Sequence, residues 1–126
     1  MSQRLKIKRK FLKAFGTNAL NDVVFDDYKT LIKNTASTTD MTVGSSAAAV
    51  APTTTLSVAG DYTNNGEFKH DSLTGELHLT GSGRTLTGST TGTSRLNNML
   101  VSGSYTLPSG ATTTVRNLTV ASGGAL

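Results

Sequence analysis

Few side chains in this 126-residue chain have the types and spacing that metal chemistry requires. His70 and His78 lie eight residues apart, with Asp71 and Glu76 between them. A metal site needs three or four converging ligands, and His78 stands between two leucines, so a strand that buries the leucines would point it outward. The Gly- and Asp-rich nonapeptide of calcium-binding solenoids is absent. We therefore expect no metal ion and no other cofactor.

The sequence also offers few residues for acid–base or nucleophilic catalysis. The adjacent acids Asp26 and Asp27 would point to different faces of a helix. No Ser–His–Asp order or Gly-rich phosphate loop stands out, and the absence of cysteine excludes thiol nucleophiles and disulfides. The sequence predicts that the chain is not an enzyme.

The positive charge is concentrated at the N-terminal end. Residues 1–34 carry a net charge of +5, residues 35–50 carry −1 and residues 51–126 carry none, which gives the overall +4. Such a basic segment can bind nucleic acid, bind an acidic protein, or be a solvated face. We expect an acidic protein rather than nucleic acid, because Phe11 and Phe15 belong to an apolar stripe rather than to the charged face.

Two short helices are predicted within residues 1–34, forming a basic anchor. In the first, Ile7, Phe11, Ala14 and Phe15 follow helical spacing. In the second, apolar residues from 20 to 32 share a face. The two apolar faces have more surface than the helices can bury against each other, so we expect them to dock onto a partner. The predicted docking residues are Arg4, Leu5, Ile7, Lys8, Lys10, Phe11, Leu12, Lys13 and Phe15.

The composition favours an extended β architecture for the rest of the chain. The sequence has 22 Thr, 13 Ser and 13 Gly but only 6% aromatic residues, and Thr and Gly are poor helix formers. Residues 35–52 are small, polar and almost uncharged, which predicts a linker or strap. No apolar run is long enough to span a membrane, and the apolar core of a secretory signal is missing.

A repeat occupies residues 53–126. Its unit is an apolar residue, any residue, an apolar residue, a small residue and then Gly or Ser, and successive units begin 21, 22 and 19 residues apart. This period is typical of a solenoid coil. Because side chains alternate along a strand, we expect both apolar positions of every unit to stack in an inward column. The inward residues are Leu56, Val58, Leu77, Leu79, Met99, Val101, Leu118 and Val120.

A second strand-like piece lies between successive units. It covers residues 66–69, 84–87 and 104–107, and we expect these three pieces to occupy equivalent positions. The fold class predicted is therefore mainly β, with coils of about 20 residues preceded by the helical anchor. Only about three and a half coils precede Leu126 and no cap follows. We expect either a longer chain, which we favour, or neighbouring subunits that cover the edge.

The repeats resemble those of β-helical proteins from phage fibres, phage tailspikes and bacterial surface adhesins. The resemblance rests on three runs: residues 60–68 (GDYTNNGEF), 75–86 (GELHLTGSGRTL) and 96–103 (LNNMLVSG). It covers about residues 56–126 and implies an architecture more than a function. In such proteins the β-helix is a shaft or an adhesive.

This resemblance implies a structural protein of a virion. Phage proteins assemble in the host cytoplasm and need no export signal, and the order of anchor, strap and shaft matches a particle-proximal part of a tail fibre, tailspike or head fibre. The implied partners are other virion proteins, bound through the anchor, and two further copies in a homotrimer. The alternative is a bacterial cell-surface adhesin or filament subunit.

Overall fold

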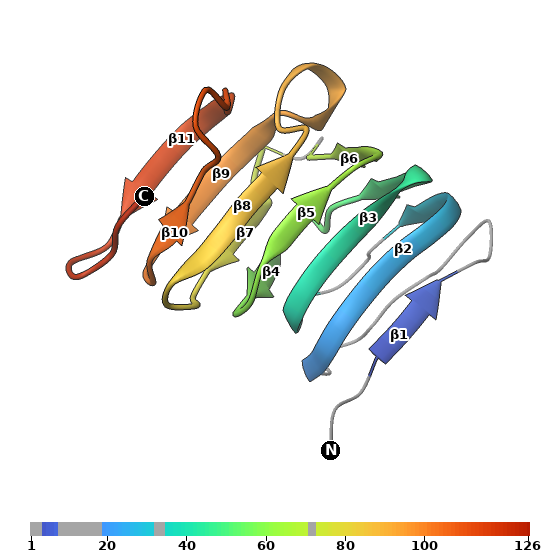
Figure 1. Cartoon of the computed structure of the whole chain (residues 1–126), viewed down its shortest axis with the longest axis horizontal. Helices are drawn as coiled ribbons and strands as arrows, with labels where there is room; N and C mark the ends of the chain where they lie inside the picture. The colour runs from blue at the N-terminus through green and yellow to red at the C-terminus, as the bar shows by residue number, and fades with distance from the viewer. Residues whose placement is uncertain (1–3, 8–18, 32–34, 71–72) are drawn as a thin grey trace.

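The computed structural model describes residues 4–7, 19–31, 35–70 and 73–126. It is mainly β and winds as a parallel β-solenoid of about four turns, so this part of the predicted fold class is confirmed. Figure 1 shows the coils side by side, from β1 at one end to β11 at the other. The strands are β1 (Arg4–Ile7), β2 (Ala19–Leu31), β3 (Ala36–Val50), β4 (Thr55–Val58), β5 (Tyr62–Asn64), β6 (Glu67–Lys69), β7 (Glu76–Leu79), β8 (Arg84–Gly88), β9 (Leu96–Val101), β10 (Tyr105–Thr106) and β11 (Val115–Val120), with a 3₁₀ turn, η1 (Gly92–Ser94), before β9.

The long strand β3 defines the three faces of the solenoid. Its residues 36–38 pair with β4, its residues 41–43 with β5 and its residues 48–50 with β6. The first face continues from β4 to β7, β9 and β11, and the second from β5 to β8 and β10. All the pairings described are parallel, so each coil adds one ladder of backbone hydrogen bonds to the coil before it.

The predicted helices are wrong where the structure describes them. Residues 4–7 form β1, and residues 19–31 form β2, which pairs with β3 from Ala19 to Leu31. No α-helix occurs in the described ranges. Valines and aromatics at period 3.6 also suit a strand, and the ladder to β3 satisfies the backbone that a helix would have paired internally. The remainder of the predicted first helix lies outside the described residues.

The predicted linker is also wrong, because residues 36–50 form β3. Its side chains alternate between buried and partly exposed, and Met41, Val43, Ala47 and Ala49 are buried. Alanine suits positions 47 and 49 because larger side chains of the neighbouring coil, such as Phe68, fill the interior. Residues 35–52 therefore belong to the solenoid itself.

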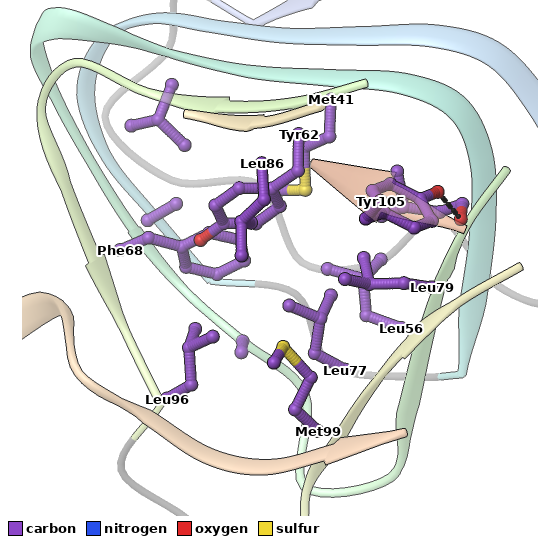
Figure 2. Close-up of a cluster of buried hydrophobic side chains, with 14 of the residues drawn as sticks. Met41, Leu56, Tyr62, Phe68, Leu77, Leu79, Leu86, Leu96, Met99 and Tyr105 are labelled. Atoms are coloured by element: carbon purple, nitrogen blue, oxygen red, sulfur yellow. Dashed lines mark hydrogen bonds between the residues drawn. The ribbon is translucent and has the colours of Figure 1, made fainter. Parts of the chain in front are cut away.

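The inward column follows the repeat. Leu56 pairs in register with Leu77, and Leu77 with Met99. Six of the eight expected column residues are at most 2% exposed: Leu56, Val58, Leu77, Leu79, Met99 and Val101. Figure 2 shows their labelled members pointing into the space that the coil encloses. In β11, Leu118 and Val120 continue the column but are 46% and 44% exposed, since among the described residues β11 pairs with β9 alone.

A buried tyrosine, Tyr105, forms hydrogen bonds between coils at one corner of the stack. The Tyr105 hydroxyl lies 2.8 Å from the carbonyl oxygens of both Val58 and Gly60, and it accepts a hydrogen bond from the Gly81 N–H at 3.2 Å. Gly81 must be glycine, because a Cβ there would lie 2.1 Å from the Ala59 carbonyl oxygen. Three successive coils thus meet around one phenol ring.

The predicted equivalence of the second strand pieces is only partly right. β8 and β10 do pair with each other, but β8 also pairs with β5 and not with β6. β6 therefore lies on the third face, where it pairs with β3.

Candidate functional site

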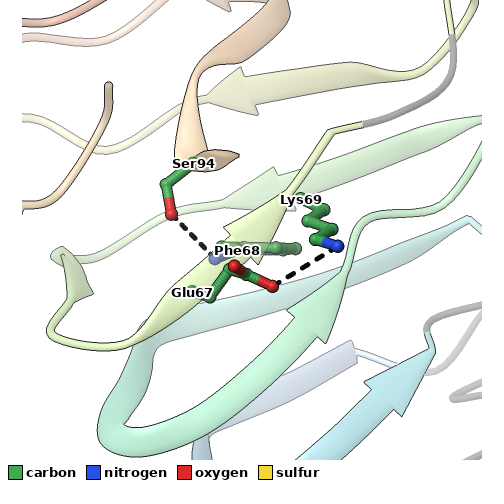
Figure 3. A network of polar contacts seen from close by, with 4 residues as sticks. All are labelled: Glu67, Phe68, Lys69 and Ser94. Atoms are coloured by element: carbon green, nitrogen blue, oxygen red, sulfur yellow. Dashed lines mark hydrogen bonds and ion pairs between the residues drawn. The ribbon is translucent and has the colours of Figure 1, made fainter. Parts of the chain in front are cut away.

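The third face changes its construction beyond β6. No strand of the described chain pairs with the outer edge of β6, and η1 contacts it instead. The Phe68 N–H in β6 donates to the Oγ of Ser94 in η1 at 3.1 Å, as Figure 3 shows. Ser94 is 2% exposed, so this side chain takes the place of a strand carbonyl. Within the turn, the Ser94 N–H donates a hydrogen bond to the Thr91 carbonyl, and the Arg95 N–H donates one to the Gly92 carbonyl.

A hollow of about 430 Å³ opens where the turn replaces the strand. It is lined by residues from the end of β6 and from the turn of the following coil: Lys69, His70, Gly92, Thr93 and Arg95. Gly92 adopts a positive φ of 57°, which an L side chain rarely adopts and which turns the chain sharply into η1. The lining residues therefore include two cationic residues, a histidine and a threonine.

His70 forms the buried wall of this hollow. Its ring packs against the Phe68 ring with centroids 4.6 Å apart, and the residue is 9% exposed. The backbone carbonyl of His70 accepts a hydrogen bond from the Asn97 side-chain amide of the next coil. The Nε2 atom has no hydrogen-bond partner among the described residues. Burial lowers the pKa of His70 to about 4, so the ring is neutral at pH 7.

The charges near the hollow are unevenly paired. Lys69 lies 3.6 Å from the Glu67 carboxylate, and both side chains are about one-third exposed. Within the described residues, no ion pair to Arg95 is found and no carboxylate lines the hollow. The described lining residues thus include two cations, Lys69 and Arg95, and Lys69 is shared with an acid outside the lining.

The two histidines do not converge on a metal site. The Nε2 of His78 lies 2.8 Å from the Oγ of Ser102 on the outer surface, whereas His70 is buried. No group of three or more candidate metal ligands occurs in the described residues.

The predicted docking residues are only partly placed. Arg4, Leu5 and Ile7 lie in β1, the strand at the N-terminal end of the stack. The others lie outside the described residues: Lys8, Lys10, Phe11, Leu12, Lys13 and Phe15.

Sequence reasoning missed the hollow because its residues come from two coils. Lys69 and His70 precede η1 by more than twenty positions, and nothing in their types marks them as neighbours. A usable signal is the coil length, since Asn98 follows Gly88 by 10 residues, whereas their partners Glu76 and Asn64 are 12 residues apart. A coil of changed length predicts an irregular turn at one face.

None of the helices in the described part of the chain has the length and apolar character needed to cross a bilayer. Comparison with protein-family models, curated proteins and solved structures finds no match to this chain.

Proposed function

We propose that this chain is a structural shaft segment of a phage virion, the particle-proximal part of a tail fibre, tailspike or head fibre. The observation that carries the proposal is the in-register stack of apolar residues from β4 through β7 and β9 to β11. A stack of this kind propagates one cross-section along an axis, which is the mechanical requirement of a shaft. The resemblance of the repeats to those of phage fibres supports the choice of assembly.

Attachment to the particle is assigned to the N-terminal end. Residues 1–34 hold most of the positive charge, and β1 has only β2 as a neighbour among the described strands. A strand edge offers unpaired backbone groups to a partner strand, and the basic residues between β1 and β2 favour an acidic partner surface. This docking mode takes the place of the helical anchor that the sequence suggested.

The proposed assembly is a homotrimer in which each chain keeps its own core. Met41, Leu77 and Leu79 are at most 1% exposed within a single chain, so trimerisation does not require intertwined copies. Three solenoids would instead associate side by side. Sedimentation equilibrium should then give three times the 13.1 kDa chain mass, and a single-chain mass at micromolar concentration would exclude the trimer.

The test of the function is incorporation into particles. A tagged full-length chain, produced in infected host cells, should appear in virions purified on a density gradient. A triple variant, Lys8→Glu, Lys10→Glu and Lys13→Glu, should keep its β-rich circular dichroism and be lost from the particles. If the tagged chain is instead retained on uninfected cells and absent from virions, the proposal fails and a bacterial surface adhesin takes its place.

A further inference from the structure

The geometry points to the hollow between β6 and η1 as a binding site for a small anionic sugar, a monosaccharide that carries a carboxylate or a phosphate. This inference is independent of the proposed function. It rests on the lining residues, the size of the hollow and the way in which the turn is held.

The lining residues select an anion. Lys69 and Arg95 approach the hollow from two different coils, and no carboxylate among the described residues lines it. An arginine guanidinium offers paired N–H donors that match a carboxylate or a phosphate, and a lysine adds a mobile point charge. The neutral His70 ring adds bulk and polarity to the wall without adding charge.

The size and polarity of the hollow select a sugar rather than a bare ion. A volume of about 430 Å³ lies within the range of small-molecule sites, roughly 300–1,000 Å³. Thr93 and Gly92 also belong to the lining. A threonine and exposed backbone suit the hydroxyls of a sugar, whereas the described lining residues include no Leu, Ile, Val, Phe, Tyr or Trp for an apolar ligand.

The hollow is held in shape before any ligand arrives. The hydrogen bond between Phe68 and Ser94 fixes η1 on β6, and the amide of Asn97 fixes the backbone of His70. Lys69 thus ends β6, and Arg95 lies between the hydrogen-bonded turn η1 and β9. Such preorganisation lowers the ordering cost of binding. The Glu67 carboxylate, 3.6 Å from Lys69, competes with the ligand for that cation.

Titration of the full chain followed by NMR chemical shifts tests the inference, with glucuronic acid, glucose 6-phosphate and uncharged glucose as probes. At least one of the two anions should shift the amide signals around the hollow with a dissociation constant below about 10 mM, while glucose should not. The two anions separate carboxylate from phosphate recognition.

Matched variants locate the site. Arg95→Gln should weaken binding at least about tenfold, whereas Arg116→Gln, a change to an exposed arginine of β11, should leave it unchanged. Glu67→Gln should tighten binding, because it removes the acid that competes for Lys69. Absence of binding by both anions, equal binding of glucose, or an affinity that Arg95→Gln leaves intact would overturn the inference.

Discussion

Ser94 accepts a hydrogen bond from the backbone of Phe68, which lies 26 residues earlier in the chain, through its buried side-chain oxygen. This contact replaces one rung of a strand ladder and decides the course of the third face. It also creates the hollow, because a serine on a 3₁₀ turn satisfies the edge of β6 without extending the sheet outward.

Ser94→Ala should destabilise the protein by about 1–3 kcal/mol, since it removes a buried hydrogen bond to the Phe68 N–H. Urea unfolding followed by circular dichroism measures the change. Thr93→Ala is the matched control on the same turn, where the side chain is exposed, and it should stay within about 0.5 kcal/mol of the parent. Equal effects of the two changes would show that the Ser94 hydroxyl does not hold the turn.

Loss of the hydroxyl should change the free energy of unfolding differently at the two buried tyrosines, Tyr105 and Tyr62. Tyr105→Phe removes the acceptor of the Gly81 N–H and a donor to the Val58 and Gly60 carbonyls, so it should cost about 1–3 kcal/mol. Tyr62→Phe removes a hydroxyl that has no partner among the described residues and keeps the ring stacked on Phe68. That change should be neutral or stabilising, as thermal unfolding of the pair will show.

His70 should make the folded state less stable as the pH falls. Burial lowers its pKa to about 4 from 6.5, so the unfolded chain takes up the proton first. Its contribution to stability is complete above pH 6.5 and declines by about 3 kcal/mol between pH 6.5 and pH 4. Urea unfolding measured at a series of pH values across this range reports the loss of stability.

The control for this titration is His70→Phe, which keeps an aromatic ring beside Phe68. All other titratable groups are common to both proteins, so the difference between the two pH curves isolates His70. The variant should lose less stability on acidification from pH 7 to pH 5. Parallel curves would mean that His70 is not buried as a neutral ring.

The apolar column should be sensitive to truncation in its interior and tolerant at its last strand. Leu77→Ala should cost about 2–5 kcal/mol, because a fully buried side chain leaves a cavity between two coils. Leu118→Ala, in the same column but 46% exposed, should cost less than about 1 kcal/mol. Comparable losses at both positions, in the same unfolding assay, would argue against a column whose burial decreases at β11.

The sequence predicted the column but not the course of the chain around it. Leucine and valine at period two, repeated every 21 or 22 residues, indicate both the strands and their register. Leu20, Val24, Tyr28 and Leu31 follow the helical period, and it is the pairing with β3 that makes residues 19–31 a strand. The alanines at 47 and 49 alternate with partly exposed residues, but small side chains give a weak burial signal, so the sequence of β3 resembled a linker.

The hollow could not be predicted from residue types, because it depends on which face lacks a strand. The repeat units align well on the first face, whereas the pieces between them differ in length and pair differently. Only the three-dimensional register brings Lys69 next to Arg95. Single-sequence patterns define local periodicity, and a site shared by two coils is a property of the stack.

Disulfide trapping between neighbouring coils tests the solenoid most directly, because the chain has no cysteine of its own. Ser57 and His78 are paired across β4 and β7, and strands in a sheet lie about 4.8 Å apart, within the span of a disulfide. The double variant Ser57→Cys with His78→Cys should oxidise readily, whereas Ser57→Cys with Thr119→Cys, three strands apart or about 14 Å, should not. Mass spectrometry of the oxidised monomers gives the result, and a bridge in the second pair with none in the first would contradict the stack.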